Sequence, residues 1–404
     1  MPRLRYGLIG CGRRSAAHIE VVSALPEIYE VVAVCDALAA SAERAAVRLG
    51  VTAYTNVAEM VAREKLDICD IGVPNELHHG VSCYLSAHGI HHTVETPLAP
   101  TLGLMDSMIE TARRYGVTLQ TSENFPFLPV EQFTVMLIQA GVIGRVHRCY
   151  RLFSVIWYHG LAAIRRRMGA RPIAVTSIAH TMPVTPYMDA VGRDWRSESL
   201  EFYAVDFEGG GLAIALVGNK NNCLGRNKLI GFEVVGERGT IITNGNQGVT
   251  GSETVNVCID EEIAVANAMA STYEFRREYT PAGMLQRIWI DLPSSLGGTV
   301  AWVNPYKERE ISEVNISLAT LLEALGRTVM GDGELAWPAS EGRLDRELMI
   351  AAERSIAAGR RPVPLPVPLD PTEEAAFDRD FIERFGIHPR EDVEKVLSVS
   401  FKAR

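Results

Sequence analysis

The sequence predicts a two-domain α/β protein, in which a doubly wound parallel sheet is followed by an α+β domain with a mostly antiparallel sheet. Strands and helices alternate over residues 1–124, which is typical of parallel βαβ units. From residue 125 the strands lengthen and follow one another, with glycine-rich turns between them. The length of 404 residues suits two domains, or three.

The first domain is expected over residues 1–124. Arg5–Ile9 is a strand, Gly10-Cys11-Gly12 a tight turn, and Ser15–Leu25 a helix with an apolar stripe. Val31–Cys35 is a fully apolar strand, as expected of a strand that is covered on both faces. Later helices are predicted over Ala39–Leu49, Leu77–His88 and Leu102–Tyr115, and later strands over Ile68–Val73, His92–Val94 and Thr118–Gln120.

The second domain is expected over residues 125–361. Its helices should include Ile311–Val329 and Leu344–Ala358, and its strands are predicted over Leu200–Phe207, Gly211–Val217, Leu229–Val235 and Thr240–Thr243. Residues 362–404 are expected to form an arm and a short helical tail. The arm should be extended, because proline recurs at alternate positions from Pro362 to Pro368.

Composition excludes several classes of protein. The net charge of −9 disfavours a nucleic-acid partner, and no apolar run is long enough to span a membrane. The seven cysteines contain no CxxC pair, so free buried thiols are expected rather than a disulfide framework or a metal site. The N-terminus lacks the pattern of a signal peptide, and a cytoplasmic protein is predicted.

A dinucleotide site is expected where the first strand meets the first helix. Gly10 permits the sharp turn, Gly12 allows a pyrophosphate to approach the backbone, and Ser15 is small enough for close packing. Asp36 ends the second strand, where a carboxylate can bind both hydroxyls of the adenosine ribose. NAD is therefore favoured over NADP. The alternative is that Asp36 only caps the next helix.

Three further motifs come in order along the chain. They are Val73-Pro74-Asn75-Glu76-Leu77-His78, Val94-Glu95-Thr96-Pro97 and Glu123-Asn124-Phe125. With the glycine turn and Asp36, this set resembles the Gfo/Idh/MocA (glucose–fructose oxidoreductase / inositol dehydrogenase) family. The resemblance implies an N-terminal Rossmann domain and a C-terminal open-faced sheet. It also implies oxidation or reduction of sugar- or polyol-like hydroxyl groups, and a homodimer or homotetramer.

The resemblance completes the set of expected cofactor residues. Pro74, Asn75 and His78 would lie along the nicotinamide side and Glu95 near the nicotinamide ribose, although His78 could instead be a surface residue of a polar turn. All predicted cofactor-binding residues are Gly10, Gly12, Arg13, Ser15, Asp36, Pro74, Asn75, His78, Glu95 and Asn124.

The catalytic positions depart from the family pattern. Thr96 stands where the family usually has a lysine that assists proton transfer. In the second catalytic motif His159 is kept, while the two aspartate positions carry Val155 and Ala162. His159 is therefore predicted as the acid/base, with Tyr158 or Thr96 relaying the proton, since imidazole titrates near neutral pH. The alternative is a structural histidine at a helix N-terminus.

Other residues near this motif are weaker candidates. His180 and Tyr187 could line the pocket, and Arg165–Arg167 is expected to be a solvated helix face rather than a phosphate site.

Three functions remain open from the sequence. The first is an NAD-dependent oxidoreductase that acts on a sugar-like hydroxyl or keto group. The second keeps NAD bound and uses transient oxidation for elimination, epimerisation or glycoside cleavage. The third is a non-catalytic NAD(H)-binding protein.

Overall fold

The computed structural model describes residues 2–154, 157–188, 194–218, 231–244, 254–257 and 271–399. The chain forms two compact units, and each contains segments that are distant in sequence. Unit 1 comprises Met1–Asn124, Leu318–Arg346 and Pro368–Arg404, and unit 2 comprises Phe125–Ser317 and Glu347–Val367.

Unit 1 is built on a six-stranded parallel sheet, in the order β3-β2-β1-β4-β5-β6. This confirms the predicted doubly wound sheet. The strand order reverses between β1 and β4, and ligands of such sheets bind beyond the carboxyl ends of the strands at this point. The strands are β1 (Leu4–Ile9), β2 (Tyr29–Cys35), β3 (Thr52–Tyr54), β4 (Ile68–Ile71), β5 (His91–Val94) and β6 (Leu119–Thr121).

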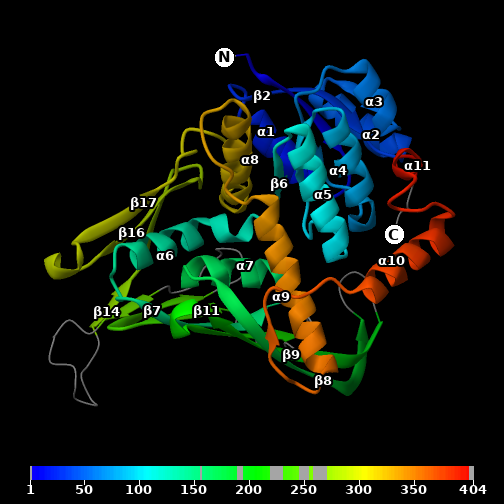
Figure 1. The fold of residues 1–404 in the computed structure, drawn as a ribbon. Helices are drawn as coiled ribbons and strands as arrows, with labels where there is room; N and C mark the ends of the chain where they lie inside the picture. The colour runs from blue at the N-terminus through cyan, green and yellow to red at the C-terminus, as the bar shows by residue number, and fades with distance from the viewer. Residues whose placement is uncertain are drawn as a thin grey trace. The chain divides into compact units, whose positions relative to one another are not determined.

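Helices cover this sheet, and Figure 1 shows α4 and α5 side by side. Capping residues set several of their ends: Asn56 accepts from the Glu59 amide at the start of α3, and Thr101 from the Leu104 amide at the start of α5. The first-unit helices are α1 (Ser15–Ser23), α2 (Ala39–Leu49), α3 (Val57–Arg63), η1 (Asn75–Leu77), α4 (His78–Ala87) and α5 (Leu102–Tyr115).

Chain segments from far along the sequence complete unit 1. Helix α8 (Ile316–Val329) is held by hydrogen bonds from Tyr29 and Gln120 to the carbonyl groups of Leu322 and Leu321. After α9 (Ala339–Ala357), the tail adds α10 (Pro371–Phe385) and α11 (Val393–Val396), which are red in Figure 1. The tail helix α10 has 15 residues and is longer than the short helix that the sequence predicts.

Unit 2 contains a nine-stranded sheet, in the order β14-β13-β12-β11-β7-β10-β9-β8-β18. Its paired strands are antiparallel except for β7 and β10, so the predicted mostly antiparallel sheet is confirmed. The strands are β7 (Val146–Ser154), β8 (Pro172–Met188), β9 (Asp194–Phe207), β10 (Leu212–Gly218), β11 (Gly231–Gly236), β12 (Gly239–Asn244), β13 (Thr254–Val257), β14 (Ser271–Glu274) and β18 (Val363–Pro364).

The proline-rich arm lies at the edge of this sheet. Val363 and Pro364 of β18 pair with Val175 and Ala174 of β8. Proline lacks an amide donor and is tolerated at sheet edges, which explains why the arm ends the sheet rather than extending it. The arm is extended at Val363–Pro364, as the alternating prolines predict, and it bends at residues 365 and 366, where the Leu365–Pro366 peptide bond is cis.

A second, three-stranded sheet was not foreseen from the sequence. It consists of β15 (Arg276–Tyr279), β16 (Leu285–Asp291) and β17 (Thr299–Val303) in antiparallel pairs. Helix α6 (Pro129–Gln139) packs against β16 and β17, and α7 (Trp157–Met168) packs against β7 and β10.

The arginine run on α7 is not a solvated face, so that expectation was wrong. Arg165 is buried and Arg167 is fully buried. The Arg167 guanidinium forms two hydrogen bonds to the Glu131 carboxylate, at 2.7 and 2.6 Å, and lies 4.0 Å from the centre of the Phe232 ring. Arg167 can thus be buried in the core, because its charge is paired with the carboxylate of Glu131, 36 residues away in sequence.

Candidate functional site

The turn between β1 and α1 has the backbone geometry of an anion site. Gly10 has φ of +95°, and a Cβ there would lie 2.5 Å from the Gly72 carbonyl oxygen, so only glycine fits. A Cβ on Gly12 would meet no atom within 4 Å, which leaves space for a ligand against the backbone. Helix α1 begins at Ser15 without a side-chain cap, so its N-terminal amides can bind a phosphate.

Asp36 lies beside this turn at the end of β2. Its Oδ2 accepts from the Cys11 amide and its Oδ1 from the Leu38 amide, both at 2.8 Å. The N-cap residue of α2 is Leu38, and no side chain caps this helix, so the capping alternative for Asp36 is wrong. A carboxylate has about four acceptor positions, and two of them stay available for hydroxyl groups.

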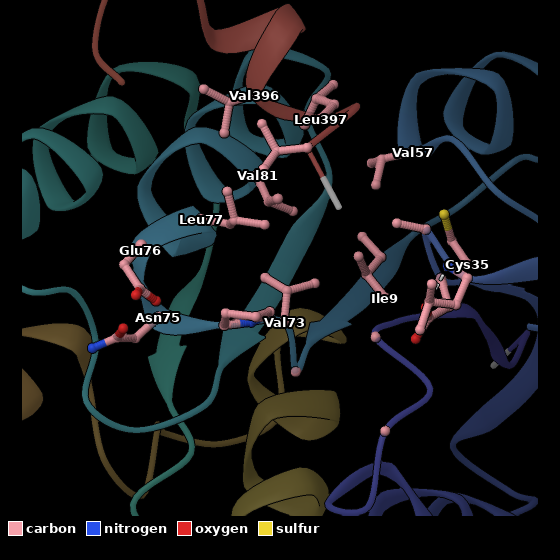
Figure 2. A pocket seen from close by; sticks show the side chains of 18 of the residues that line it. Ile9, Cys35, Val57, Val73, Asn75, Glu76, Leu77, Val81, Val396 and Leu397 are labelled. Carbon is pink, nitrogen blue, oxygen red and sulfur yellow. Dashed lines mark hydrogen bonds between the residues drawn. The ribbon is translucent and has the colours of Figure 1, made fainter. Parts of the chain in front are cut away.

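A cavity of about 650 Å³ opens at this turn within unit 1 (Figure 2). It lies where the strand order reverses, as expected for a nucleotide site. Six of the predicted cofactor residues line it: Gly10, Gly12, Arg13, Asp36, Pro74 and Asn75. Further lining residues include Arg14, Leu38, Val57, Leu77, Val81, Val396, Leu397 and Val399.

The other four predicted cofactor residues, Ser15, His78, Glu95 and Asn124, are not among the residues that line the cavity. Ser15 is buried, and its hydroxyl donates to the Gly12 carbonyl oxygen. His78 is buried rather than at the surface, so the surface alternative is wrong. Its Nε2 lies 2.9 Å from the Val73 oxygen and its Nδ1 3.1 Å from the Pro97 oxygen, and burial lowers its pKa. His78 thus connects two loops.

Glu95 belongs to a buried network with His18. This network was not predicted from the sequence. One His18 ring nitrogen bonds to Asp70 and the other lies 2.8 Å from Glu95 Oε1. Because ionised carboxylates only accept hydrogen bonds, both nitrogens must donate, and His18 is an imidazolium. Burial opposes this charge, but Asp70 and Glu95 together outweigh it and raise the pKa of His18 to about 9.

Arg14 links this network to the predicted residue Asn124. Its Nε donates to Glu95 Oε1 at 2.7 Å and its Nη2 to Asn124 Oδ1 at 3.2 Å. Burial opposes ionisation of Glu95, but the hydrogen bonds and charges of His18 and Arg14 hold its pKa well below its ordinary range. Glu95 therefore stays ionised, with both oxygens directed by neighbouring donors.

Thr96 follows Glu95 and uses the same carboxylate. Its amide donates to Glu95 Oε2 at 3.0 Å, and its hydroxyl lies 3.4 Å from that oxygen. Thr96 thus offers a neutral hydroxyl group where the family pattern has a cation.

The remaining catalytic candidates lie in unit 2, on α7. The His159 ring is buried and stacks on Phe125 with 4.1 Å between ring centres and 4° between planes. The Tyr158 ring meets it edge-on at 4.4 Å. These contacts define the orientation of the imidazole. His180 and Tyr187 lie on β8, where His180 is exposed, and Val155 lies outside the described residues.

In the part of the chain that the structure describes, no three His, Cys, Asp or Glu residues are grouped as a metal site would require. No helix in the same residues has the length and apolar character needed to cross a membrane.

Comparison with known proteins points to a NAD-binding Rossmann fold in this part of the chain. The family model described as "Oxidoreductase family, NAD-binding Rossmann fold" matches residues 4–123. Residues 4–123 are thus similar to the NAD-binding domain of the Gfo/Idh/MocA oxidoreductases. The matched segment contains the glycine turn, Asp36 and the Glu95 network.

Curated relatives match about a third of the chain. The D-apiose dehydrogenase of Paraburkholderia graminis is 30% identical over 143 residues, which are 35% of this chain and 38% of that protein. A glycosyl hydrolase family 109 protein of Streptomyces coelicolor is 36% identical over 155 residues, which are 35% of this chain and 32% of that protein. The chain thus matches only about a third of the length of these Gfo/Idh/MocA relatives.

Solved structures extend the similarity in fold to most of the chain. Levoglucosan dehydrogenase in complex with NADH and L-sorbose has a TM-score of 0.69 at 20% identity, and covers 91% of this chain and 100% of its own. An NAD-binding oxidoreductase from Klebsiella pneumoniae has a TM-score of 0.67 at 20% identity, with the same coverage. At this identity the likeness concerns the fold.

Proposed function

We propose that this protein is an NAD-dependent oxidoreductase that transfers a hydride between nicotinamide and a hydroxyl or keto group of a sugar- or polyol-like molecule. The observation that carries the proposal is the cavity at the reversal of strand order, which is bounded by the glycine turn and Asp36. Bound NAD would supply the hydride acceptor for the substrate carbon.

Different residues of unit 1 would bind different parts of NAD. The open side of Gly12 and the uncapped N-terminus of α1 would hold the pyrophosphate. The remaining acceptor positions of Asp36 would bind the ribose hydroxyls, and a 2′-phosphate would be repelled there, which favours NAD over NADP. The ionised Glu95, directed by His18 and Arg14, would accept from the nicotinamide ribose.

In the proposed reaction His159 accepts the hydroxyl proton as the substrate carbon loses its hydride, and returns it in reduction. Stacking on Phe125 holds the ring in one orientation, which would help to keep its nitrogen within hydrogen-bond reach of the substrate hydroxyl. Tyr158 or Thr96 would relay the proton, since each carries a hydroxyl group.

Similarity to glycosyl hydrolase family 109 proteins favours a second candidate function. That relation is 36% identity over 155 residues for the Streptomyces coelicolor protein. In this candidate NAD stays bound, and oxidation and reduction cancel over one turnover, so that a glycosidic bond is cleaved without net NADH formation.

One set of measurements separates the candidates. NADH and NADPH are titrated by fluorescence, and turnover is then screened with NAD and sugars or polyols and, without added NAD, with nitrophenyl glycosides. Net NADH formation supports the oxidoreductase, and nitrophenol release without NADH supports the second candidate. Binding without turnover supports a non-catalytic NAD(H)-binding protein. Failure to bind either nucleotide, with no nucleotide released when the purified protein is denatured, would contradict all three. The predicted homodimer or homotetramer is tested by light scattering.

Replacing Asp36 by asparagine should weaken NADH binding about 10- to 100-fold, because hydrogen bonds to a charged group are lost. NADPH binding should weaken less or improve, since repulsion of its 2′-phosphate is removed. Fluorescence titration measures both. The matched control is Glu43→Gln, which removes a carboxylate from an exposed position of α2. Equal losses for NADH and NADPH would contradict the role of Asp36 in selecting NAD.

A further inference from the structure

The C-terminal tail of the chain returns to unit 1 and packs beside the cavity. Phe381 of α10, Val396 of α11 and Val399 form one apolar cluster with Leu77 of η1. Phe377, Phe385 and Ile387 pack against this cluster. The tail is therefore anchored by a core of its own rather than lying loosely on the surface.

Polar contacts hold the tail in one position. Glu374 of α10 accepts from the Thr101 hydroxyl at 2.6 Å and from the Gly103 amide at 2.8 Å. Arg390 bonds to Glu374 and, at 2.9 Å, to Asp378. These bonds fix the tail to the start of α5.

Two helices of unit 1 carry a glycine where the tail approaches. A Cβ on Gly80 of α4 would lie 2.6 Å from a methyl carbon of Val396. A Cβ on Gly103 of α5 would lie 2.6 Å from a carboxylate oxygen of Glu374. The close packing of the tail thus depends on these two glycines of α4 and α5 as well as on the residues of the tail.

The inner side of the tail lines the cavity. Figure 2 shows Val396 and Leu397 on the same side of it as Val81 and Leu77, with Val57 nearby and Ile9 and Val73 across from them. These side chains are apolar. They adjoin Asp36 and Leu38 in the wall of the same cavity. In a dinucleotide site the acidic residue after the second strand binds the adenosine ribose, so the neighbouring apolar part suits the adenine ring.

We infer that the segment from Val393 to Val399 forms the outer wall of the adenine subsite and slows release of the dinucleotide. This inference rests on the proposed function, since it takes the ligand to be NAD(H). The adenine ring would be enclosed by Val81 and Leu397 on one side and by Ile9 and Val73 on the other. A tail that must move aside before the base can leave slows dissociation of the cofactor.

Two variants of Leu397 test the inference, because this residue lines the cavity and is 6% exposed. Leu397→Ala should weaken NADH binding about tenfold through lost apolar contact, and Leu397→Asp should weaken it more. Both should speed NADH release in stopped-flow displacement. ADP-ribose binding should weaken in parallel, and nicotinamide mononucleotide binding should not change. The control is Ser398→Ala, at the adjacent exposed position, and thermal unfolding without ligand checks the fold of each variant.

The outcomes separate this inference from the proposed function. If the parent protein binds NADH and ADP-ribose but both Leu397 variants bind them equally well, the segment from Val393 to Val399 is not the wall of the adenine subsite. The proposed function then stands. Tighter binding by the variants would also overturn the inference, since the tail would then occupy the place of the base. If the parent, shown to be free of bound nucleotide, binds neither NADH nor ADP-ribose, both proposals fail.

Discussion

Replacing His159 by phenylalanine should lower kcat by about 10²- to 10⁴-fold, the usual contribution of a general acid–base group. Phenylalanine can keep the stacking on Phe125, so the variant removes the proton carrier while retaining the aromatic packing. NADH affinity should stay within twofold of the parent, because the cofactor residues of unit 1 are untouched. Steady-state kinetics with the best substrate of the screen measures the loss.

A second variant, His159→Ala, and a control variant, His88→Ala, are measured in the same way. The alanine variant removes both stacking and proton transfer, so it should lose turnover and also stability. His88 is an exposed histidine of unit 1, and its substitution should leave kcat unchanged. Parent-like turnover by His159→Phe would contradict the proposed role and support the structural alternative for this histidine.

Replacing His18 by leucine should lower the free energy of unfolding by about 3–5 kcal/mol, as expected when one partner of a buried ion pair is removed. The variant leaves the carboxylates of Asp70 and Glu95 without the cation that separates them. Urea unfolding followed by circular dichroism measures the change. His18→Leu combined with Asp70→Asn should recover part of the loss, because one buried charge is removed. A loss below about 1 kcal/mol would contradict the charged state of His18.

The stabilisation by His18 should also depend on pH in a stated direction. Its pKa is raised to about 9 in the folded protein, above the ordinary value of 6.5. Its contribution is therefore fully present below pH 6.5 and is lost as the pH rises through about 9. On the acid side the contribution of Glu95 falls as its carboxylate is protonated, because its folded pKa is depressed. The stability difference between the parent and His18→Gln should thus shrink from pH 6.5 to pH 9.5. A constant difference would contradict this assignment.

The first part of the site could be predicted because it is local in sequence. The glycine turn joins β1 directly to α1, and Asp36 ends the next strand, so chain connectivity alone places them together. The alternation of strands and helices predicted the parallel sheet, whose topology brings these turns to one edge. Pro74 and Asn75 follow β4, the neighbour of β1, and line the same cavity.

Residues whose partners are distant in sequence could not be placed in this way. His18 lies on the first helix, 52 residues from Asp70 and 77 from Glu95, and nothing in its local pattern predicts two carboxylate partners. The same holds for Arg167. The local sequence predicts a solvated helix face for this residue, but in the structure it is buried and paired with Glu131. A long-range partner changes the cost of burying a charge, and only the folded chain supplies that partner.

By itself, the sequence determined the class of fold, and it located the glycine turn and the carboxylate Asp36, because each depends on neighbours along the chain. The tertiary structure alone decided that His78 connects two loops rather than facing solvent, that Glu95 is held ionised by His18 and Arg14, and that the tail lines the cavity at the glycine turn. The tail lies more than 300 residues from the glycine turn and reaches it through apolar packing on Leu77 and close approach to Gly80. Such contacts depend on surfaces that exist only after the chain has folded.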